Sequence, residues 1–301
     1  MKINTIERVS RYVESEEKTQ SSHWKKYHSN FKYNNGKLYG LEGFGTINPP
    51  FRGLKKIVYN ALLTRYYKHI HDKSFFKNIK SKAIEITRKQ NRAFDLDVFR
   101  QCLTIDFLLY HNVIEKSKTV IVIGDGWGIM TTLLLKLNLA NRVILVNLNK
   151  TLLVDLIYTE LVLPEIVNNS FLIENKEDIS KIKKEKLLTI RADKYELLSY
   201  LEKDVVINIA SFQEMDIEVI NNYLKYLEYG EKPFHLYHCN REEKLLPDGS
   251  IIKIEDFKFN SNKKSIVSEE CSWHKDFISK RPPFILKYDG KTIHQLLQLN
   301  L

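Results

Sequence analysis

The feature that most constrains the fold of this chain is a regular alternation of apolar and amphipathic segments between residues 118 and 240. Five apolar runs of strand length follow one another here, and they read TVIVIG, RVILVN, KLLTIRA, DVVINIA and FHLYHCN. A helix-like segment follows each of the first four runs. Strands that are apolar on both faces and alternate with helices indicate a parallel sheet covered on both sides. Right-handed crossovers predict that this sheet is doubly wound.

The two ends of the chain differ from this central region. Near the C-terminus, Asp289 and Gly290 separate two strand-like runs, which predicts an antiparallel hairpin. The periodicity shows only the sheet, but a mainly parallel sheet closed by such a hairpin resembles the layout of class I S-adenosylmethionine-dependent methyltransferases. By this analogy we interpret residues 106–301 as a Rossmann-like methyltransferase domain. Residues 1–105 combine helical patterns with an aromatic, turn-rich stretch, and we interpret them as an extension that forms part of the acceptor pocket.

Three glycines at alternate positions, Gly124, Gly126 and Gly128, follow the first apolar run directly. The chain has only 11 glycines in 301 residues, so this cluster needs a structural reason. A glycine loop between a strand and a helix lets the backbone approach a ligand, and the helix N-terminus adds free N–H groups. The dinucleotide pattern G-x-G-x-x-G would need glycine at Ile129, so the observed spacing favours S-adenosylmethionine over NAD. A purely structural turn is the alternative.

Three polar residues near the predicted strand ends are candidate partners for the same cofactor. Asp125 either meets the ammonium group of the methionine part or serves the turn and the start of the next helix. Asn147 ends the second strand, where ribose hydroxyls need an oxygen acceptor, or it only terminates that strand. Asp193 follows the third strand and either receives the adenine amino group or caps the next helix.

The segment DVVINIASFQEMD, residues 204–216, ends the fourth strand beside the glycine loop and is expected to face the transferring methyl group. Glu214 is a candidate general base, although a carboxylate in a first helical turn also compensates the helix dipole. Gln213 is a candidate partner for a sugar hydroxyl. Asn208 and Ser211 complete the candidate substrate-binding residues of this segment.

The fifth apolar run supplies a second set of candidates. Histidine is the usual general base near neutral pH, so His238 is a second candidate, although a histidine in a strand is more often structural. Asn240 and Arg241 follow it as candidate substrate-binding residues. The spacing of His, Asp and Glu residues predicts no metal site, and no G-x-S-x-G nucleophile motif is present.

Composition limits the environment and the partners. The net charge is +10, but basic residues are interspersed with acidic ones, which disfavours a nucleic-acid partner and leaves a phosphorylated or nucleotide-linked acceptor compatible. No apolar run is long enough to cross a bilayer. Cys102, Cys239 and Cys271 are far apart and odd in number, so they predict neither a disulfide framework nor a zinc knuckle. We expect a cytoplasmic location.

Several separate motifs resemble those of the bacterial sugar O-methyltransferase family. They lie between about residues 20 and 275 and read SHWKKY, VIVIGDGWG, VNLNKTLLVDLIYTELVLP, INIASFQEM and YHCNREEKLLPDG. The resemblance implies methyl transfer from S-adenosylmethionine to a sugar. Two positions depart from the usual pattern, because Val122 replaces an acidic residue and Asn147 replaces the ribose-binding aspartate. These departures leave open a weakened cofactor site or a non-catalytic relative.

The sequence therefore predicts an α/β, Rossmann-like class I methyltransferase. Its substrate is expected to be a sugar hydroxyl of a surface polysaccharide or of the nucleotide-linked precursor. The alternatives are methylation of another acceptor, such as a phosphorylated small molecule or a nucleic acid, NAD-dependent oxidation of a sugar, and a non-catalytic cofactor-binding protein. The oxidoreductase would need the third glycine one position later and a Tyr-Lys hydride-site pair that the chain does not offer.

Overall fold

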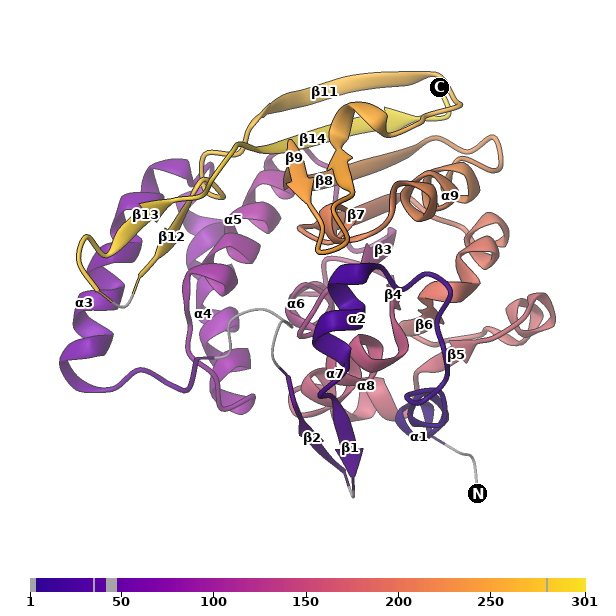
Figure 1. Cartoon of the computed structure of the whole chain (residues 1–301), viewed down its shortest axis with the longest axis horizontal. Helices are drawn as coiled ribbons and strands as arrows, with labels where there is room; N and C mark the ends of the chain where they lie inside the picture. The colour runs from indigo at the N-terminus through magenta and orange to yellow at the C-terminus, as the bar shows by residue number, and fades with distance from the viewer. Residues whose placement is uncertain (1–3, 35, 42–47, 280) are drawn as a thin grey trace.

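One eight-stranded sheet forms the centre of the computed structural model, which describes residues 4–34, 36–41, 48–279 and 281–301 (Figure 1). The six strands from β3 to β8 are parallel to one another, and β14 is antiparallel to both of its neighbours, β8 and β11. In spatial order the strands are β11 (Lys263–Glu270), β14 (Thr292–Leu299), β8 (Phe234–Arg241), β7 (Val205–Ile209), β3 (Thr119–Ile123), β4 (Arg142–Asn147), β6 (Leu187–Arg191) and β5 (Phe171–Ile173). The mainly parallel, doubly wound sheet expected from the sequence is confirmed.

Strand residues alternate between two hydrophobic cores, one on each face of the sheet. In β3, Val120 and Val122 face one core, whereas Ile121 and Ile123 face the other. The first core is covered by α4 (Lys73–Lys89), α5 (Leu96–Tyr110), α6 (Ile129–Lys136) and α7 (Asn149–Glu160), and the second by η3 (Ala192–Tyr200) and α9 (Ile217–Leu227). Burial on both faces explains why these strands are apolar at every position.

The C-terminal antiparallel strands are confirmed, but their pairing differs from the expected hairpin. β13 (Ile285–Lys287), which precedes Asp289 and Gly290, pairs with β12 (Asp276–Ile278) in a separate two-stranded sheet. β14, which follows the turn, instead lies between β8 and β11. Gly290 has φ +79°, but Asp289 does not have a positive φ, so the two residues do not form the type I′ turn of a two-residue hairpin. The longer β14 instead buries its apolar side chains in the main sheet.

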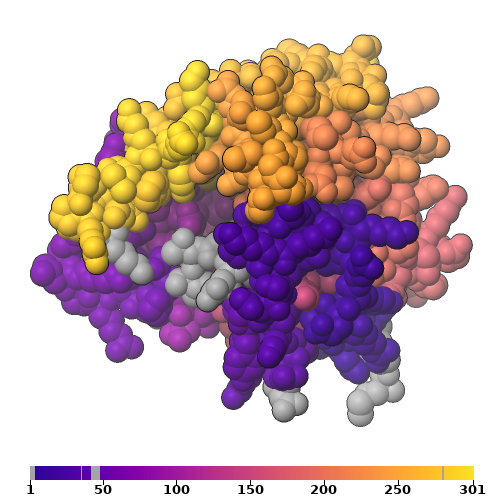
Figure 2. Space-filling model, viewed as in Figure 1, coloured from indigo at the N-terminus to yellow at the C-terminus, as the bar shows by residue number. Residues whose placement is uncertain are grey.

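The N-terminal extension is continuous with the rest of the molecule. The expected boundary at residue 105 falls inside α5, whose residues pack in the same core as β3. α1 (Thr5–Ser10) packs against α7 and β5, while α2 (Ser22–His28) lies beside the segment that follows β8 (Figures 1 and 2). Part of the extension, residues 1–3, 35 and 42–47, lies outside the described residues.

The other elements of the described residues lie outside the main sheet. They are β1 (Lys32–Asn34), β2 (Lys37–Tyr39), α3 (Gly53–Leu63), η1 (Thr64–His69), α8 (Pro164–Asn168), η2 (Lys176–Lys181), η4 (Phe212–Glu214), β9 (Glu243–Leu245), β10 (Ile251–Lys253) and η5 (Ile254–Asp256). No helix within the described ranges is long and apolar enough to cross a membrane.

Candidate functional site

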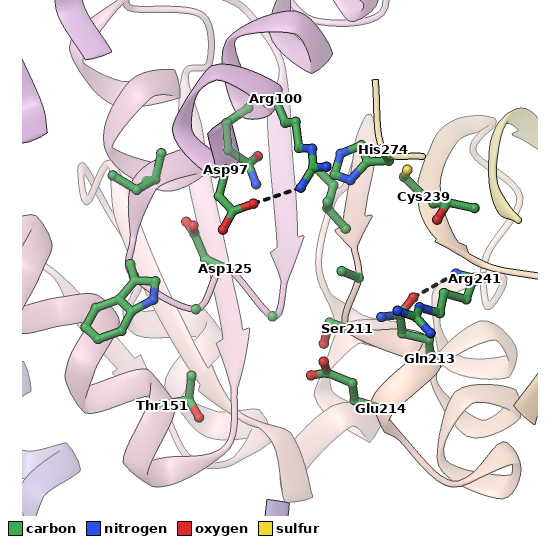
Figure 3. A pocket seen from close by; sticks show the side chains of 18 of the residues that line it. Asp97, Arg100, Asp125, Thr151, Ser211, Gln213, Glu214, Cys239, Arg241 and His274 are labelled. Carbon is green, nitrogen blue, oxygen red and sulfur yellow. Dashed lines mark hydrogen bonds and ion pairs between the residues drawn. The ribbon is translucent and has the colours of Figure 1, made fainter. Parts of the chain in front are cut away.

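A cavity of about 440 Å³ opens at the carboxyl ends of β3, β4, β7 and β8 (Figure 3). This is the edge at which doubly wound sheets bind their ligands. Most residues chosen from the sequence line it, from both the cofactor and the acceptor sets. They are Gly124, Asp125, Gly126, Asn147, Ser211, Gln213, Glu214 and Arg241.

The glycine loop has the tight geometry that its sequence predicts. Gly124 has φ +75°, and a Cβ there would collide with the side chain of Ser211. Gly128 has φ +63° and is the residue before α6, where a Cβ would lie 2.6 Å from the carbonyl oxygen of Asp155. Gly124 and Gly126 line the cavity, whereas Gly128 instead lets α6 pack closely on α7. The loop therefore combines an open backbone surface with a structural turn.

Asp125 serves the start of α6. Its Oδ1 accepts the N–H of Met130 at 3.0 Å, and its Oδ2 accepts the N–H of Thr131 at 2.7 Å. Burial raises the pKa of this carboxyl. Both backbone bonds agree with the helix-terminal interpretation, but Asp125 also lines the cavity, so its role toward a ligand's ammonium group stays a prediction.

Asn147 is held by a buried carboxyl. Its Nδ2 donates to Asp155 Oδ2 at 2.8 Å, and its Oδ1 accepts the N–H of Leu148 at 3.0 Å. Asp155 also accepts the N–H of Gly128 at 3.0 Å, so one carboxyl ties the glycine loop to the end of β4. Burial raises the pKa of Asp155 well above its ordinary value. The amide of Asn147 lines the cavity, and its proposed contact with ribose would use the remaining lone pair of Oδ1.

Asp193 does not line the cavity, contrary to its expected place in the cofactor site. The N-terminal extension covers this end of the sheet, because Glu17 Oε1 accepts the N–H of Asn149 at 2.8 Å and the centre of the Tyr12 ring lies 3.9 Å from the guanidinium of Arg191. Asp193 Oδ2 lies 3.6 Å from Arg191 Nη2, and its Oδ1 is buried with no hydrogen-bond partner among the described residues. Its proposed contact with adenine stays a prediction.

Two of the predicted substrate-binding residues are structural instead. Asn208 Nδ2 donates to the carbonyl oxygen of Ile123 at 3.1 Å, and its Oδ1 accepts from Asn240 Nδ2 at 3.0 Å. Asn240 Oδ1 in turn accepts the N–H of Gln213 at 3.2 Å. Both amides are fully buried and neither lines the cavity, so they hold the turn after β7. The prediction that Asn208 and Asn240 bind substrate is wrong because both are buried, and a buried amide needs its N–H and oxygen groups for hydrogen bonds to buried partners.

Ser211, Gln213 and Arg241 lie where the sequence places them. Figure 3 shows all three on one wall of the cavity, with Asp125 and Asp97 on the opposite wall. Gln213 Oε1 accepts the N–H of Arg241 at 2.7 Å, which fixes the amide and leaves its Nε2 group for a ligand. Their contact with substrate stays a prediction.

Glu214 is the carboxyl best placed to exchange a proton in the cavity. Burial raises the pKa of Glu214 to about 8, and the positive charges of Lys244 and Arg241 offset only part of this effect. Its Oε1 lies 3.6 Å from His23 Nε2 of α2. Burial also lowers the pKa of His23 to about 4, so near neutral pH the imidazole is uncharged and the carboxyl mostly holds its proton.

His238 is wrong as a candidate base. The alternation along β8 turns Cys239 toward the cavity and His238 toward the other core, where its ring lies 5.6 Å from Phe257. His238 Nε2 lies 2.9 Å from Gln295 Oε1, and burial lowers the pKa of the imidazole to about 4. A fully buried, neutral histidine outside the cavity does not reach an acceptor there.

Sequence reasoning missed the cationic wall that the N-terminal extension supplies. Arg92 is 5% exposed, and its guanidinium lies 4.6 Å from the ring centre of Trp127. Its Nε and Nη1 are buried with no hydrogen-bond partner among the described residues. Arg100 also lines the cavity, but it donates to Asp97 Oδ1 at 2.9 Å (Figure 3). Arg92 follows a helix outside the alternating region, so no local motif marks it.

The strand order and the site together define the fold of class I S-adenosylmethionine-dependent methyltransferases, with the antiparallel β14 inserted between β8 and β11. No protein-family model matches the sequence, and no curated protein matches it. The resemblance to the sugar O-methyltransferase family therefore stays a prediction.

Solved structures match over large parts of the chain at low similarity. MtNAS in complex with MTA and tNA is 10% identical, with 81% of this chain and 71% of that chain covered and a TM-score of 0.39. The methyltransferase domain of bacterial CtHen1 is 13% identical, with 68% of this chain and 100% of that domain covered and a TM-score of 0.39. Likeness at this level carries no conclusion about activity, cofactor or acceptor.

Proposed function

We propose that this chain is an S-adenosylmethionine-dependent methyltransferase whose cofactor binds along the glycine loop. The observation that carries the proposal is the buried guanidinium of Arg92, whose Nε and Nη1 have no hydrogen-bond acceptor among the described residues. Buried N–H groups of a cation that lack an acceptor are costly, and a bound anion removes that cost. Arg92 lines the same cavity as Gly124 and Gly126, so the methionine carboxylate is the fitting anion.

The other cofactor contacts follow from the same wall of the cavity. Asp125 would face the ammonium group and Asn147 the ribose. Asp193 lies outside the cavity, but its Oδ1 has no hydrogen-bond partner among the described residues, which supports its role as the acceptor for the adenine amino group if the cofactor extends beyond the cavity. The acid missing at Val122 is no obstacle to this arrangement, because Val122 is buried in the core rather than exposed to the cavity.

The proposed acceptor is a sugar hydroxyl of a surface polysaccharide or of its nucleotide-linked precursor. Gln101, Ser211 and Gln213 offer hydrogen bonds along the cavity, and Trp24 and Tyr288 offer aromatic faces against which a sugar ring packs. Arg241 and Lys244 are cations suited to a phosphate. Trp24 and Gln101 belong to residues 1–105, which supports an acceptor-binding role for that extension.

The reaction is methyl transfer to oxygen. When bound, the cofactor would supply an electrophilic sulfonium methyl group to the acceptor oxygen, and its sulfur would keep the electron pair of the carbon–sulfur bond. Glu214 takes the hydroxyl proton on its carboxylate, and Arg241 and Lys244 favour the ionised form that this step needs. The cavity walls contribute most by holding the two reacting atoms in line.

Calorimetry on the full chain tests the cofactor. We expect S-adenosylmethionine and S-adenosylhomocysteine each to bind at one site per chain, and NAD not to bind. Binding of NAD alone, or of none of the three, would overturn the proposal.

The acceptor is tested separately. The chain is incubated with S-adenosylmethionine and, in parallel, with sugar acceptors of the proposed kind (a surface polysaccharide and nucleotide-linked sugars), with phosphorylated sugars and with short RNA, and the products are analysed by mass spectrometry. We expect a methylated sugar only from the first set. Methylation of RNA or of phosphorylated sugars alone would overturn the nucleotide-linked acceptor while leaving methyl transfer intact.

A further inference from the structure

Two cysteines and a histidine meet at one end of the cavity. One ligand atom from each of Cys239, Cys271 and His274 lies within 4.8 Å of the other two, and all three are buried. Both thiols are free. Cys239 and His274 line the cavity, and Figure 3 shows them beside Arg100, away from Glu214. The proposed methyl transfer uses none of these three residues.

The fold brings the three together although they are distant in sequence. Cys239 lies near the end of β8, and Cys271 directly follows β11. β14 separates these strands, and the N–H of Cys271 donates to the carbonyl oxygen of Thr292 in β14 at 2.8 Å. A turn then closes with the N–H of His274 donating to the carbonyl oxygen of Cys271 at 3.1 Å. The sequence predicted no metal site because only Cys271 and His274 are close in sequence, whereas Cys239 lies on a distant strand.

The donor set matches the preferences of one class of ion. Two sulfurs and one imidazole nitrogen are ligands that Zn²⁺ favours, and three protein ligands leave a fourth position for water or substrate. Zn–S distances of about 2.3 Å and Zn–N distances of about 2.0–2.1 Å place tetrahedral ligand atoms about 3.4–3.8 Å apart, so a small inward movement forms the site. His274 Nε2 has no hydrogen-bond partner among the described residues.

The surroundings also suit a charged centre. Arg100 Nε donates to the carbonyl oxygen of Trp273 at 2.8 Å, and its guanidinium also donates to the carbonyl oxygen of Asp276, so Arg100 holds the turn that carries His274. Its charge is paired with Asp97 at 2.9 Å. Two thiolates balance one divalent cation, so the whole cluster is neutral when loaded.

We propose that Cys239, Cys271 and His274 bind one divalent cation of the Zn²⁺ class, with its fourth coordination position open to the cavity. This position takes water or the oxygen of an acceptor, and coordination lowers the pKa of the bound water or hydroxyl group. The metal site does not rest on the proposed methyl transfer, because metal binding is measured on the chain alone.

Cobalt binding to the full chain tests the site. Protein freed of metal with a chelator is titrated with Co²⁺ under reducing conditions, and absorption is recorded. We expect one Co²⁺ per chain, a thiolate-to-cobalt band in the near ultraviolet, strong tetrahedral bands in the visible, and loss of all of them when Zn²⁺ is added. Absence of thiolate bands would overturn the proposal.

Matched cysteine variants locate the binding. Cys271→Ser is expected to remove the thiolate bands, whereas Cys102→Ser, which changes a buried cysteine of α5 outside the cluster, is expected to keep them. His274→Gln is expected to weaken Co²⁺ affinity at least tenfold. Bands that survive Cys271→Ser, or that vanish equally in Cys102→Ser, would contradict the assignment.

A second measurement uses the unsubstituted protein, so that a misfolded variant does not decide the question. Zn²⁺ is expected to slow alkylation of Cys239 and Cys271 at least tenfold, with Cys102 as the internal reference. Equal rates with and without Zn²⁺ would overturn the site.

Discussion

At the scale of single residues, Arg92 has opposite effects on folding and on binding, because its buried Nε and Nη1 have no acceptor among the residues that the structure describes. Arg92→Gln removes a buried cation, so the melting temperature of the unliganded protein is expected to be kept or raised. The same change removes charge-assisted hydrogen bonds of about 1.5–3 kcal/mol, so affinity for S-adenosylhomocysteine is expected to fall about 10- to 150-fold. Thermal unfolding and calorimetry on one preparation measure both.

The matched control is Arg88→Gln, which makes the same change at an exposed position of α4. It is expected to leave affinity unchanged. If Arg92→Gln unfolds the protein or leaves affinity intact, the guanidinium is structural and the cofactor carboxylate lies elsewhere.

Glu214 provides a prediction in pH. Burial raises the pKa of this carboxyl to about 8, and only its ionised form accepts a proton. We therefore expect kcat/KM for methyl transfer to rise about tenfold per pH unit up to about pH 8 and then to level off. Glu214→Gln is expected to reduce kcat at least 100-fold, because general-base catalysis contributes about 10²–10⁴-fold, with affinity for S-adenosylhomocysteine unchanged.

The control is His238→Gln, which changes a histidine outside the cavity, and its kcat is compared with that of Glu214→Gln. A larger loss of kcat in His238→Gln than in Glu214→Gln would restore His238 as the base. Small and equal losses in both would mean that methyl transfer needs no base at this site.

At the scale of elements, the glycine loop couples β3 to the turn after β7. In Gly124→Ala the new methyl group meets the Ser211 side chain, and φ +75° is unfavourable for alanine. The expected result is a loss of about 1–3 kcal/mol in the free energy of unfolding, measured in urea, together with weaker cofactor binding. Gly124→Ala with Ser211→Gly is expected to recover part of both.

Gly230→Ala separates strain from collision. Gly230 has φ +105°, a Cβ added there would meet no atom within 4 Å, and the residue precedes β8 at the opposite edge of the sheet. The variant is expected to lower stability by about 1 kcal/mol without changing affinity. An equal loss of affinity in both variants would show that the effect is global.

The sequence predicts those elements whose local pattern and tertiary role agree. β3 and β4 are apolar at nearly every position because both faces are buried, so the local sequence pattern is enough to predict these strands and their place inside the sheet. β13 fails for the opposite reason: Ile285–Lys287 has the pattern of a hairpin strand next to Asp289–Gly290, but its partner is decided by competition with β11 for β14.

The site was predictable where it lies at strand ends and unpredictable where tertiary packing brings it together. Gly124 follows β3, Asn147 ends β4 and Glu214 lies in the turn after β7, so strand order alone places them at one edge. Asn240 also lies near the carboxyl end of its strand, but its Nδ2 donates to Asn208 Oδ1 rather than to the cavity, because β7 and β8 are neighbours. Arg92 and His274 come from outside the alternating segment, where no periodicity indicates a side chain's direction.

At the scale of the whole molecule, buried acids and buried imidazoles set the pH of greatest stability. Burial raises the pKa of Glu17 from 4.5 to about 7, so its stabilising contribution is complete below about pH 4.5 and is lost as pH rises to about 7. Burial lowers the pKa of His28 from 6.5 to about 3, so its contribution is complete above about pH 6.5 and is lost as pH falls. Stability measured in urea is expected to be greatest near pH 5–6.

Glu17→Gln tests the alkaline side of this profile. Glutamine keeps the Oε1 acceptor for the N–H of Asn149 but has no charge to bury. The variant is expected to match the unsubstituted protein at pH 5 and to exceed its free energy of unfolding by up to about 3 kcal/mol at pH 8. Glu16→Gln, at the exposed neighbouring position, is expected to follow the unsubstituted protein throughout. If the free energy of unfolding of Glu17→Gln stays parallel to that of the unsubstituted protein from pH 5 to 8, the pKa of Glu17 is not raised by burial. In that case the N–H of Asn149 donates to a carboxylate that is ionised over this whole range.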